Sequence, residues 1–345
     1  DFLAVYTATQ NDTVAANAPV HGTAAHGAVF VFRRDNGSYV LHQRLLSTSS
    51  AAPGRCGHAV ALSFPHLVRG CPEDSIPGVS DRSGSVGHFW YDPGTDRFQP
   101  GGGQGAAQTD ARTGAAVALS RNYLAYAEPT AGGGPGRVVV MRRNAATDRF
   151  FGAGSVQEAA LTPGPDVSGF GWSLALREPG ALVVGEPGNV RLAIGAPFTV
   201  YAGNIRPRGS AFVYQRALGA PNWILNATMR PAPEGSAAAA WGWFGAAVAM
   251  NRNQLLVGAP DNRWSSVQTV PGPGTAHRYV LASNLGNWSW QHQEDSGPVN
   301  LPDGLANGLR FGAALALGFD NLIAVGAPGT PSVGGGRPEG GLAER

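Results

Sequence analysis

The side chains of this chain that could do chemistry are few, and its two cysteines are the most informative of them. Cys56 and Cys71 lie 15 positions apart, at the two ends of an apolar stretch that is interrupted by a turn. In an antiparallel hairpin these ends come close together, so a disulfide is plausible, and it would indicate an oxidising compartment. Two buried free thiols are the alternative.

Histidines and acidic residues give no comparable signal. The eight histidines are scattered, and only His21 and His26 lie close together, in an expected loop. The acidic pairs at 73–74 and 294–295 follow predicted strand ends, which favours solvated turns. Sequence motifs of metalloproteases, serine hydrolases, P-loop proteins and CxxC sites are absent. The 23 acidic residues allow a glycosidase pair without pointing to one, so we predict no enzyme, catalytic residue or cofactor.

Tryptophans are concentrated in the last third of the chain and are the best candidates for a ligand surface. Trp241 and Trp243 precede a strand in a connection that should reach the surface, and Trp264 follows the next strand pair. Tryptophan offers a large contact area with a polar handle for a protein or a glycan. Packing between sheets is the alternative interpretation.

Four Asn-x-Ser/Thr sequences mark candidate glycosylation sites. Two of them fall in equivalent hairpin turns, one in a loop and one inside a predicted outer strand. In chain order they are Asn11, Asn36, Asn226 and Asn287.

The elements that must position all these residues are set by a repeated motif. It starts with an aromatic residue and Gly, continues through an apolar hairpin and ends in Gly-Ala-Pro, most clearly over 244–260 and 311–328. Copies start near positions 2, 56, 113, 170, 244 and 311. We end the copy at 170 with Pro187, although Pro197 closes a second near-copy. Such self-similarity is typical of repeat architectures.

Two further strands follow the motif in each of the first five repeats. The third begins at a glycine: Gly27, Gly84, Gly136, Gly209 and Gly274. The fourth is expected in the segments that start at Ser38, Asp96, Asp148, Asn222 and Asn287. No stretch has the apolar spacing of a helix, so each repeat predicts four antiparallel strands.

The motif resembles the FG-GAP repeats of integrin α-subunit β-propellers and of related extracellular propellers. The resemblance covers nearly the whole chain and implies an all-β, β-propeller fold of four-stranded antiparallel blades, commonly seven. About five and a half blades are recognisable over residues 1–330, and 331–345 reads as a Gly/Pro-rich tail or linker. The remaining blades are absent from this segment, supplied by other domains or another chain, or unrecognisable.

Calcium is where the chain departs from this family. Many members carry several aspartates between the first two strands of the motif, and Ca²⁺ needs such converging oxygens. None of the corresponding loops here offers more than one carboxylate: 63–66, 120–123, 177–180, 251–254 and 318–321. We therefore expect no calcium in these repeats, and we predict no metal-binding residue.

Composition narrows the choice of function. The net charge is +2 and no dense basic cluster occurs, which argues against nucleic acid, and no apolar run is long enough for a membrane span. The chain starts at Asp without a signal peptide, so we expect a mature or excised segment. We predict a secreted or cell-surface binding and assembly module of the adhesion type, with a protein partner. A carbohydrate-binding propeller, or an accessory domain of a polysaccharide-active enzyme that contacts extracellular glycan, is the alternative.

Overall fold

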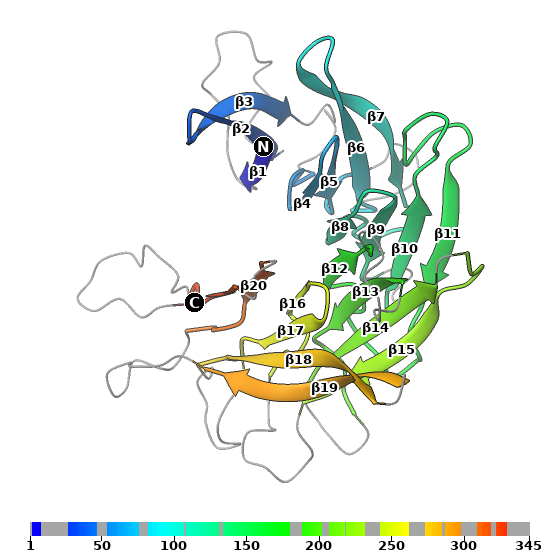
Figure 1. The fold of residues 1–345 in the computed structure, drawn as a ribbon. Coiled ribbons are helices and arrows are strands. Elements are labelled where there is room, and N and C mark those ends of the chain that lie inside the picture. Colours follow the sequence, from blue (N-terminus) through cyan, green and yellow to red (C-terminus); the bar gives the residue numbers. More distant parts are fainter. Residues whose placement is uncertain are drawn as a thin grey trace. The chain divides into compact units, whose positions relative to one another are not determined.

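The structure is a computed structural model, and every element that it describes is a β-strand. It describes residues 2–7, 27–46, 54–75, 82–106, 108–130, 134–179, 188–201, 207–217, 219–231, 242–261, 273–284, 287–297, 309–318 and 322–329. These residues form 21 strands and contain no helix (Figure 1). The all-β prediction is confirmed.

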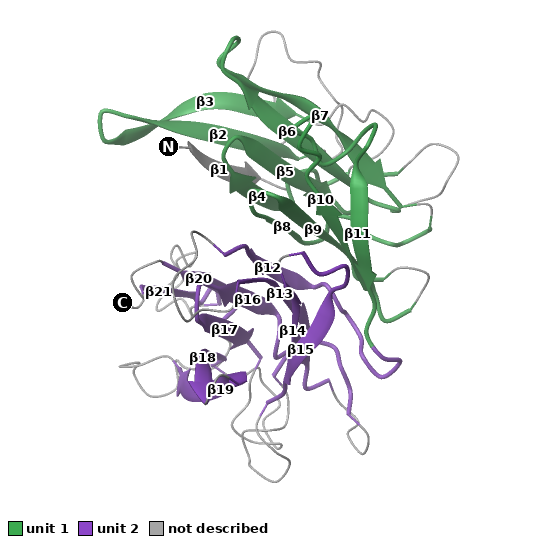
Figure 2. Ribbon diagram, turned by 45° about the vertical axis from the view of Figure 1, so that its right-hand side comes forward, with its two compact units in different colours: residues 1–163 green, residues 164–345 purple. Residues whose placement is uncertain are grey.

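The chain divides into two compact units, residues 1–163 and 164–345, which are described separately (Figure 2). The first unit holds three antiparallel sheets, ordered β1-β2-β3, β4-β5-β6-β7 and β8-β9-β10-β11. Its strands are β1 (Phe2–Thr7), β2 (Ala28–Asp35), β3 (Ser38–Leu46), β4 (Ala59–Ser63), β5 (His66–Cys71), β6 (Ser85–Asp92), β7 (Arg97–Gly105), β8 (Val117–Leu119), β9 (Tyr123–Glu128), β10 (Arg137–Arg142) and β11 (Val156–Leu161).

The second unit repeats the same plan. Its sheets are ordered β12-β13-β14-β15, β16-β17-β18-β19 and β20-β21. Its strands are β12 (Ser173–Arg177), β13 (Asn189–Ala196), β14 (Ser210–Ala217), β15 (Ile224–Met229), β16 (Ala247–Met250), β17 (Gln254–Ala259), β18 (Thr275–Asn284), β19 (Asn287–Ser296), β20 (Ala314–Leu317) and β21 (Ile323–Gly326). The predicted meander of four antiparallel strands is therefore present in four complete sheets.

The second strand of each complete sheet is the most deeply buried element. Every residue of β5, β9 and β17 is buried, and so is all of β13 except its first residue. Strands covered on both faces read as near-continuous apolar runs. These segments do so apart from a few buried polar residues, such as Arg69 and Arg191. Within each unit, hydrophobic clusters join successive sheets. One cluster joins Val68 of β5 to Leu124 of β9, and another joins Val213 of β14 to Val257 of β17.

Close backbone contact between successive sheets explains the glycines of the motif. A Cβ atom added to Gly258, in Gly-Ala-Pro, would lie 1.9 Å from the carbonyl oxygen of Gly312, in the next Phe-Gly. The same clash, also at 1.9 Å, would occur between Gly195 and Gly245. The phenylalanines beside these contacts fill the core, since Phe170, Phe244 and Phe311 are at most 1% exposed. The motif therefore encodes the packing of one sheet on the next.

A β-bulge recurs between the third and fourth strands of the first five repeats. In the first repeat these two strands are β2 and β3. The register shifts between Val31 and Phe32, Gly87 and Phe89, Val140 and Met141, Val213 and Tyr214, and Arg278 and Tyr279. Each shift lies three to five residues after the glycine that precedes the third strand. A bulge adds one residue to a strand and bends it. Sequence reasoning missed this feature because the extra residues share no residue type.

The structure corrects the alignment of the first motif copy. β1 pairs directly with β2, and Thr7 lies opposite Ala28. In the fifth repeat the Ala of Gly-Ala-Pro, Ala259, lies opposite Thr275 in the same way. β1 thus takes the place of a second strand, and the predicted match of Phe2 to the motif phenylalanine is wrong.

Two other predicted boundaries move. The copy that starts at Phe170 ends at Pro197, because β13 (Asn189–Ala196) is the strand that pairs with β12. In the third repeat the fourth strand is β11, not the segment that starts at Asp148. Phe150 and Phe151 of that segment are buried in the core, so the chain resumes pairing only after them.

Candidate binding surface

The predicted disulfide is present. Cys56 and Cys71 are joined with an S–S distance of 2.15 Å, and both residues are buried. Cys71 ends β5 and Cys56 precedes β4, so the bond closes the hairpin that the motif encodes. Cys56 stands in the place of a motif phenylalanine and Cys71 in the place of a motif alanine. The hairpin of this repeat brings these two positions side by side.

Three of the four candidate glycosylation sites lie in the described residues. Asn36 is exposed in the turn between β2 and β3, and Asn287 is exposed at the start of β19. Asn226 lies within β15, as predicted, but it is half-buried and its Oδ1 atom is covered. Asn11 lies outside the described residues. Exposure therefore favours Asn36 and Asn287 as acceptors.

A repeated tight turn sets the direction of the side chains that flank each motif. The residue before the motif adopts a positive φ, and its carbonyl accepts a hydrogen bond from the backbone N–H three residues later. The bonded pairs are Arg55 and His58, Arg112 and Ala115, Gly169 and Trp172, Trp243 and Ala246, and Arg310 and Ala313. For Trp243 this means a φ of 49°, which bulky residues rarely adopt.

In the second unit three aromatic side chains meet at these turns. Trp172 and Trp243 lie in the turns, and Phe198 directly follows Pro197. The Phe198 ring stands edge-on to Trp172, with ring centroids 4.7 Å apart, and edge-on to Trp243 at 6.1 Å. Trp172 is 44% exposed, and the other two are half-buried. We call Trp172, Phe198 and Trp243 the aromatic surface.

Polar side chains next to the aromatic surface are engaged within the protein. Thr199 is buried, and its hydroxyl donates to the carbonyl of Ala196 at 2.9 Å. The Tyr201 hydroxyl donates to the Gly209 carbonyl at 2.8 Å, and burial raises the pKa of this phenol. Val200, between them, is 38% exposed. Of residues 198–201, the one that is exposed, Val200, is therefore apolar.

The other repeats show that the fold does not require aromatic residues here. The position of Trp172 is taken elsewhere by His58, Ala115, Ala246 and Ala313. The position of Phe198 is taken by Glu73, Thr130, Asp261 and Gly329. In the second repeat this corner is charged, and Arg55 there pairs with Glu73 at 2.9 Å. Among the repeats compared, aromatic residues at these two positions therefore occur only in the fourth.

Sequence reasoning found part of this surface. Of the predicted ligand-surface residues, Trp243 lies in it, whereas Trp241 and Trp264 fall outside the described residues. Trp172 and Phe198 were missed. Phe198 was hidden because Pro187 was taken as the end of the motif, and an alignment on Pro197 would have revealed an aromatic residue where other repeats have polar or small ones.

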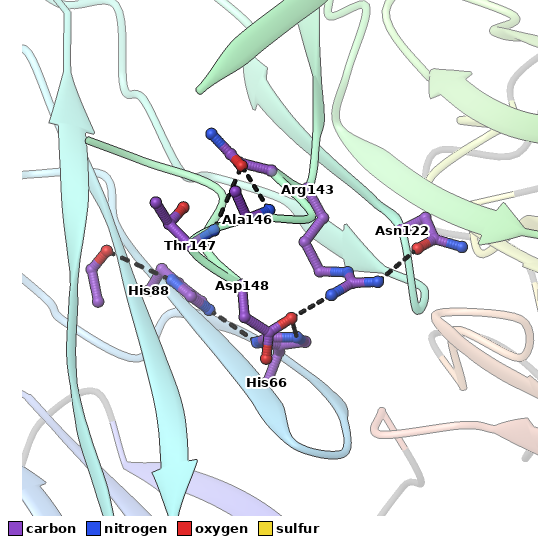
Figure 3. Close-up of polar contacts among 9 residues, drawn as sticks. His66, His88, Asn122, Arg143, Ala146, Thr147 and Asp148 are labelled. Carbon is purple, nitrogen blue, oxygen red and sulfur yellow. Dashed lines mark hydrogen bonds and ion pairs between the residues drawn. The ribbon is translucent and has the colours of Figure 1, made fainter. Parts of the chain in front are cut away.

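A second polar arrangement lies inside the first unit (Figure 3). His66 of β5 and His88 of β6 are both buried, and Nδ1 of His66 lies 3.1 Å from Nε2 of His88. Nε2 of His66 faces a carboxylate oxygen of Asp148 at 3.6 Å, and Arg143 binds the same carboxylate. Burial, reinforced by the neighbouring His66, lowers the pKa of His88 to about 4. The edge of Phe150 packs on both imidazoles, so this network holds β5, β6 and the β10–β11 connection together.

The two acidic pairs are not free turn residues. Glu73 pairs with Arg55, and Asp74 accepts a hydrogen bond from the Ser85 hydroxyl at 2.7 Å. The prediction that 294–295 forms a solvated turn is wrong, because Glu294 and Asp295 lie within β19. The bulge and the long hairpin extend β19 through this segment.

Comparison with known proteins adds no relative. No protein-family model matches the chain, and no curated protein matches it. Among the described residues, no helix has the length and apolar character needed to cross a membrane. The His21–His26 pair lies outside the described residues.

Proposed function

We propose that this chain is an extracellular binding and assembly module whose repeated sheets are the blades of a β-propeller. Its support is the succession of four-stranded meanders, which within each unit pack on one another through the glycines of the motif. The resemblance to FG-GAP repeats and the disulfide support the same proposal, since disulfides persist mainly in oxidising compartments. Repeat architectures of this kind work through composite surfaces.

The aromatic surface is the observation that carries the binding role. Trp172 is 44% exposed, and Phe198 holds it edge-on. Exposed tryptophans clustered with other aromatic side chains are typical of the few residues that dominate binding energy at protein interfaces. An aromatic corner that the other repeats lack fits a function better than it fits packing.

A protein partner fits this surface better than a sugar. Glycan sites combine a stacking ring with polar groups that bond to hydroxyls. Here the hydroxyls of Thr199 and Tyr201, which follow Phe198 in the chain, already donate to backbone carbonyls. Apolar Val200 lies between them and is exposed. Such a surface favours an apolar anchor from a protein.

A panel of immobilised extracellular proteins, with a glycan array in parallel, tests the proposal. Wild-type chain should bind a protein on the panel, and Trp172→Ala should weaken that binding by about 2 kcal/mol, or about 30-fold in Kd. The matched control is Trp288→Ala, because Trp288 lies in the same unit and is 37% exposed, away from the described contacts of the aromatic surface. Its affinity should equal that of the wild type.

Two results would contradict the protein-binding role. Binding to simple oligosaccharides that free sugar competes away, and that Trp172→Ala abolishes, would favour the carbohydrate alternative. Equal loss of affinity in Trp172→Ala and Trp288→Ala would show that the aromatic surface is not the binding site. Circular dichroism of each variant confirms that the fold is retained before binding is compared.

A further inference from the structure

The outer strand pair of the fifth repeat brings two histidines and an aspartate together. His277 lies on β18, and His292 and Asp295 lie on β19. Nδ1 of His277 is 2.6 Å from Oδ1 of Asp295, and Nε2 of His292 is 2.7 Å from the same oxygen. All three ligand atoms lie within 4.8 Å of one another.

The repeated bulge is what places these residues on one face. Side chains alternate along a strand, so residues three apart, such as His292 and Asp295, would normally point to opposite faces. The register shifts between Arg278 and Tyr279, so that Asp295 lies opposite His277 and His292 lies opposite Tyr279. One extra residue, Gln293, restores the alternation and brings both side chains to the side of His277.

The fold does not require histidine or aspartate at these three positions. In the fourth repeat the same three positions hold Phe212, Thr228 and Leu225, and the bulge is in the same place. In the third repeat they hold Val139, Ala160 and Gln157. Residues that are not metal ligands therefore satisfy this corner in these two repeats, whereas the fifth repeat places a set of metal-ligand atoms there.

We propose that His277, His292 and Asp295 bind a divalent transition-metal ion, with Zn²⁺ the best match. Two imidazole nitrogens and one carboxylate oxygen suit Zn²⁺ and its neighbours, whereas Ca²⁺ requires oxygen ligands throughout. The site differs from the loops between first and second strands, where we expected no metal. It lies on the third and fourth strands.

Burial of the site fits three protein ligands and an open position. The side chain of His277 is 10% exposed and packs against the buried Phe244, which fixes its ring. The side chains of Asp295 and His292 are 48% and 45% exposed, so the remaining coordination positions face solvent. Metal–ligand distances of about 2.0–2.2 Å require the three groups to separate slightly from hydrogen-bonding distance. The neighbouring Glu294 is engaged by Arg278 at 2.8 Å and is not needed as a ligand.

Calorimetric titration of the chelator-treated full chain with Zn²⁺ near pH 7.5 tests this proposal. Wild type should bind about one equivalent at this site, and Tm should rise by roughly 2–6 °C under saturation. His292→Leu and Asp295→Thr, which introduce the residues of the fourth repeat, should each weaken this binding at least ~100-fold, because losing a residue that only supports a ligand already costs about 10–100-fold in metal affinity. His58→Ala is the control and should bind as the wild type does.

Ring-nitrogen NMR keeps the test independent of variant folding. On Zn²⁺ addition to wild type, the Nδ1 resonance of His277 and the Nε2 resonance of His292 should shift together at one equivalent. Absence of those shifts, or variants that bind Zn²⁺ as tightly as wild type, would overturn the proposal.

Discussion

At the scale of single residues, the same position in successive repeats distinguishes a residue that serves function from one that serves packing. Trp172 occupies a place where other repeats carry alanine or histidine, and its exposure marks it as a residue the fold does not need. His88 is different. It is 1% exposed and occupies a position where three other repeats carry valine, Val31, Val140 and Val213.

The buried His88 makes stability depend on pH. Its pKa falls from 6.5 to about 4 because of burial and then of the neighbouring His66. The unfolded chain therefore binds more protons between these values. The free energy of unfolding should be constant above about pH 6.5 and fall by up to roughly 3 kcal/mol towards pH 4.

Chemical unfolding of wild type and His88→Val across pH 4–7.5 measures this effect. Valine keeps the side chain apolar and removes the titrating group, so the slope below pH 6.5 should flatten. Burial also lowers the pKa of His66, despite the opposing effect of Asp148, and this leaves a smaller residual slope. An unchanged slope in His88→Val would show that other groups control the acid sensitivity.

At the scale of elements, the sequence predicted the strands well and the sheet contacts only partly. The alternation of apolar runs and turns located most strands of the four complete sheets, because burial on both faces leaves a visible apolar pattern. It misplaced the second strand of the fourth repeat and the fourth strand of the third repeat. The bulges left no pattern of residue type, since the extra residue differs from one repeat to the next, as Asn226 and Gln293 show. The triad of His277, His292 and Asp295 depends on a bulge and was therefore invisible in the sequence.

The contact between Gly258 and Gly312 provides the prediction at this scale. Gly258→Ala would place Cβ 1.9 Å from a backbone carbonyl oxygen, so two sheets must move apart. We expect a loss of roughly 2–4 kcal/mol in the free energy of unfolding, measured by denaturant titration. Gly297→Ala is the control, because no atom lies within 4 Å of its Cβ position.

Gly258→Ala should lower the stability of the protein clearly, and Gly297→Ala should leave it nearly unchanged. Gly297→Ala should change stability by less than about 1 kcal/mol. Equal stability of both variants would mean that the sheets do not approach through the motif glycines, and the explanation of Gly-Ala-Pro would fail.

At the scale of the whole molecule, the chain consists of two compact units built on one plan. Residues 1–163 and 164–345 each hold successive antiparallel sheets joined by hydrophobic clusters. The predicted single propeller over 1–330, its blade number and the tail at 331–345 stay predictions. The aromatic surface is predictable only in part, because Trp243 stands out in the sequence whereas Phe198 depends on which Gly-x-Pro ends the motif.

The central claim is that the aromatic surface contacts a protein partner. Hydroxyl-radical footprinting of the chain, free and bound to the protein identified on the panel, tests it most directly. We expect Trp172, Phe198 and Trp243 to become protected in the complex, while Trp288 of β19 oxidises at an unchanged rate. Protection of Trp288 or of the first unit, with the aromatic surface unchanged, would contradict it.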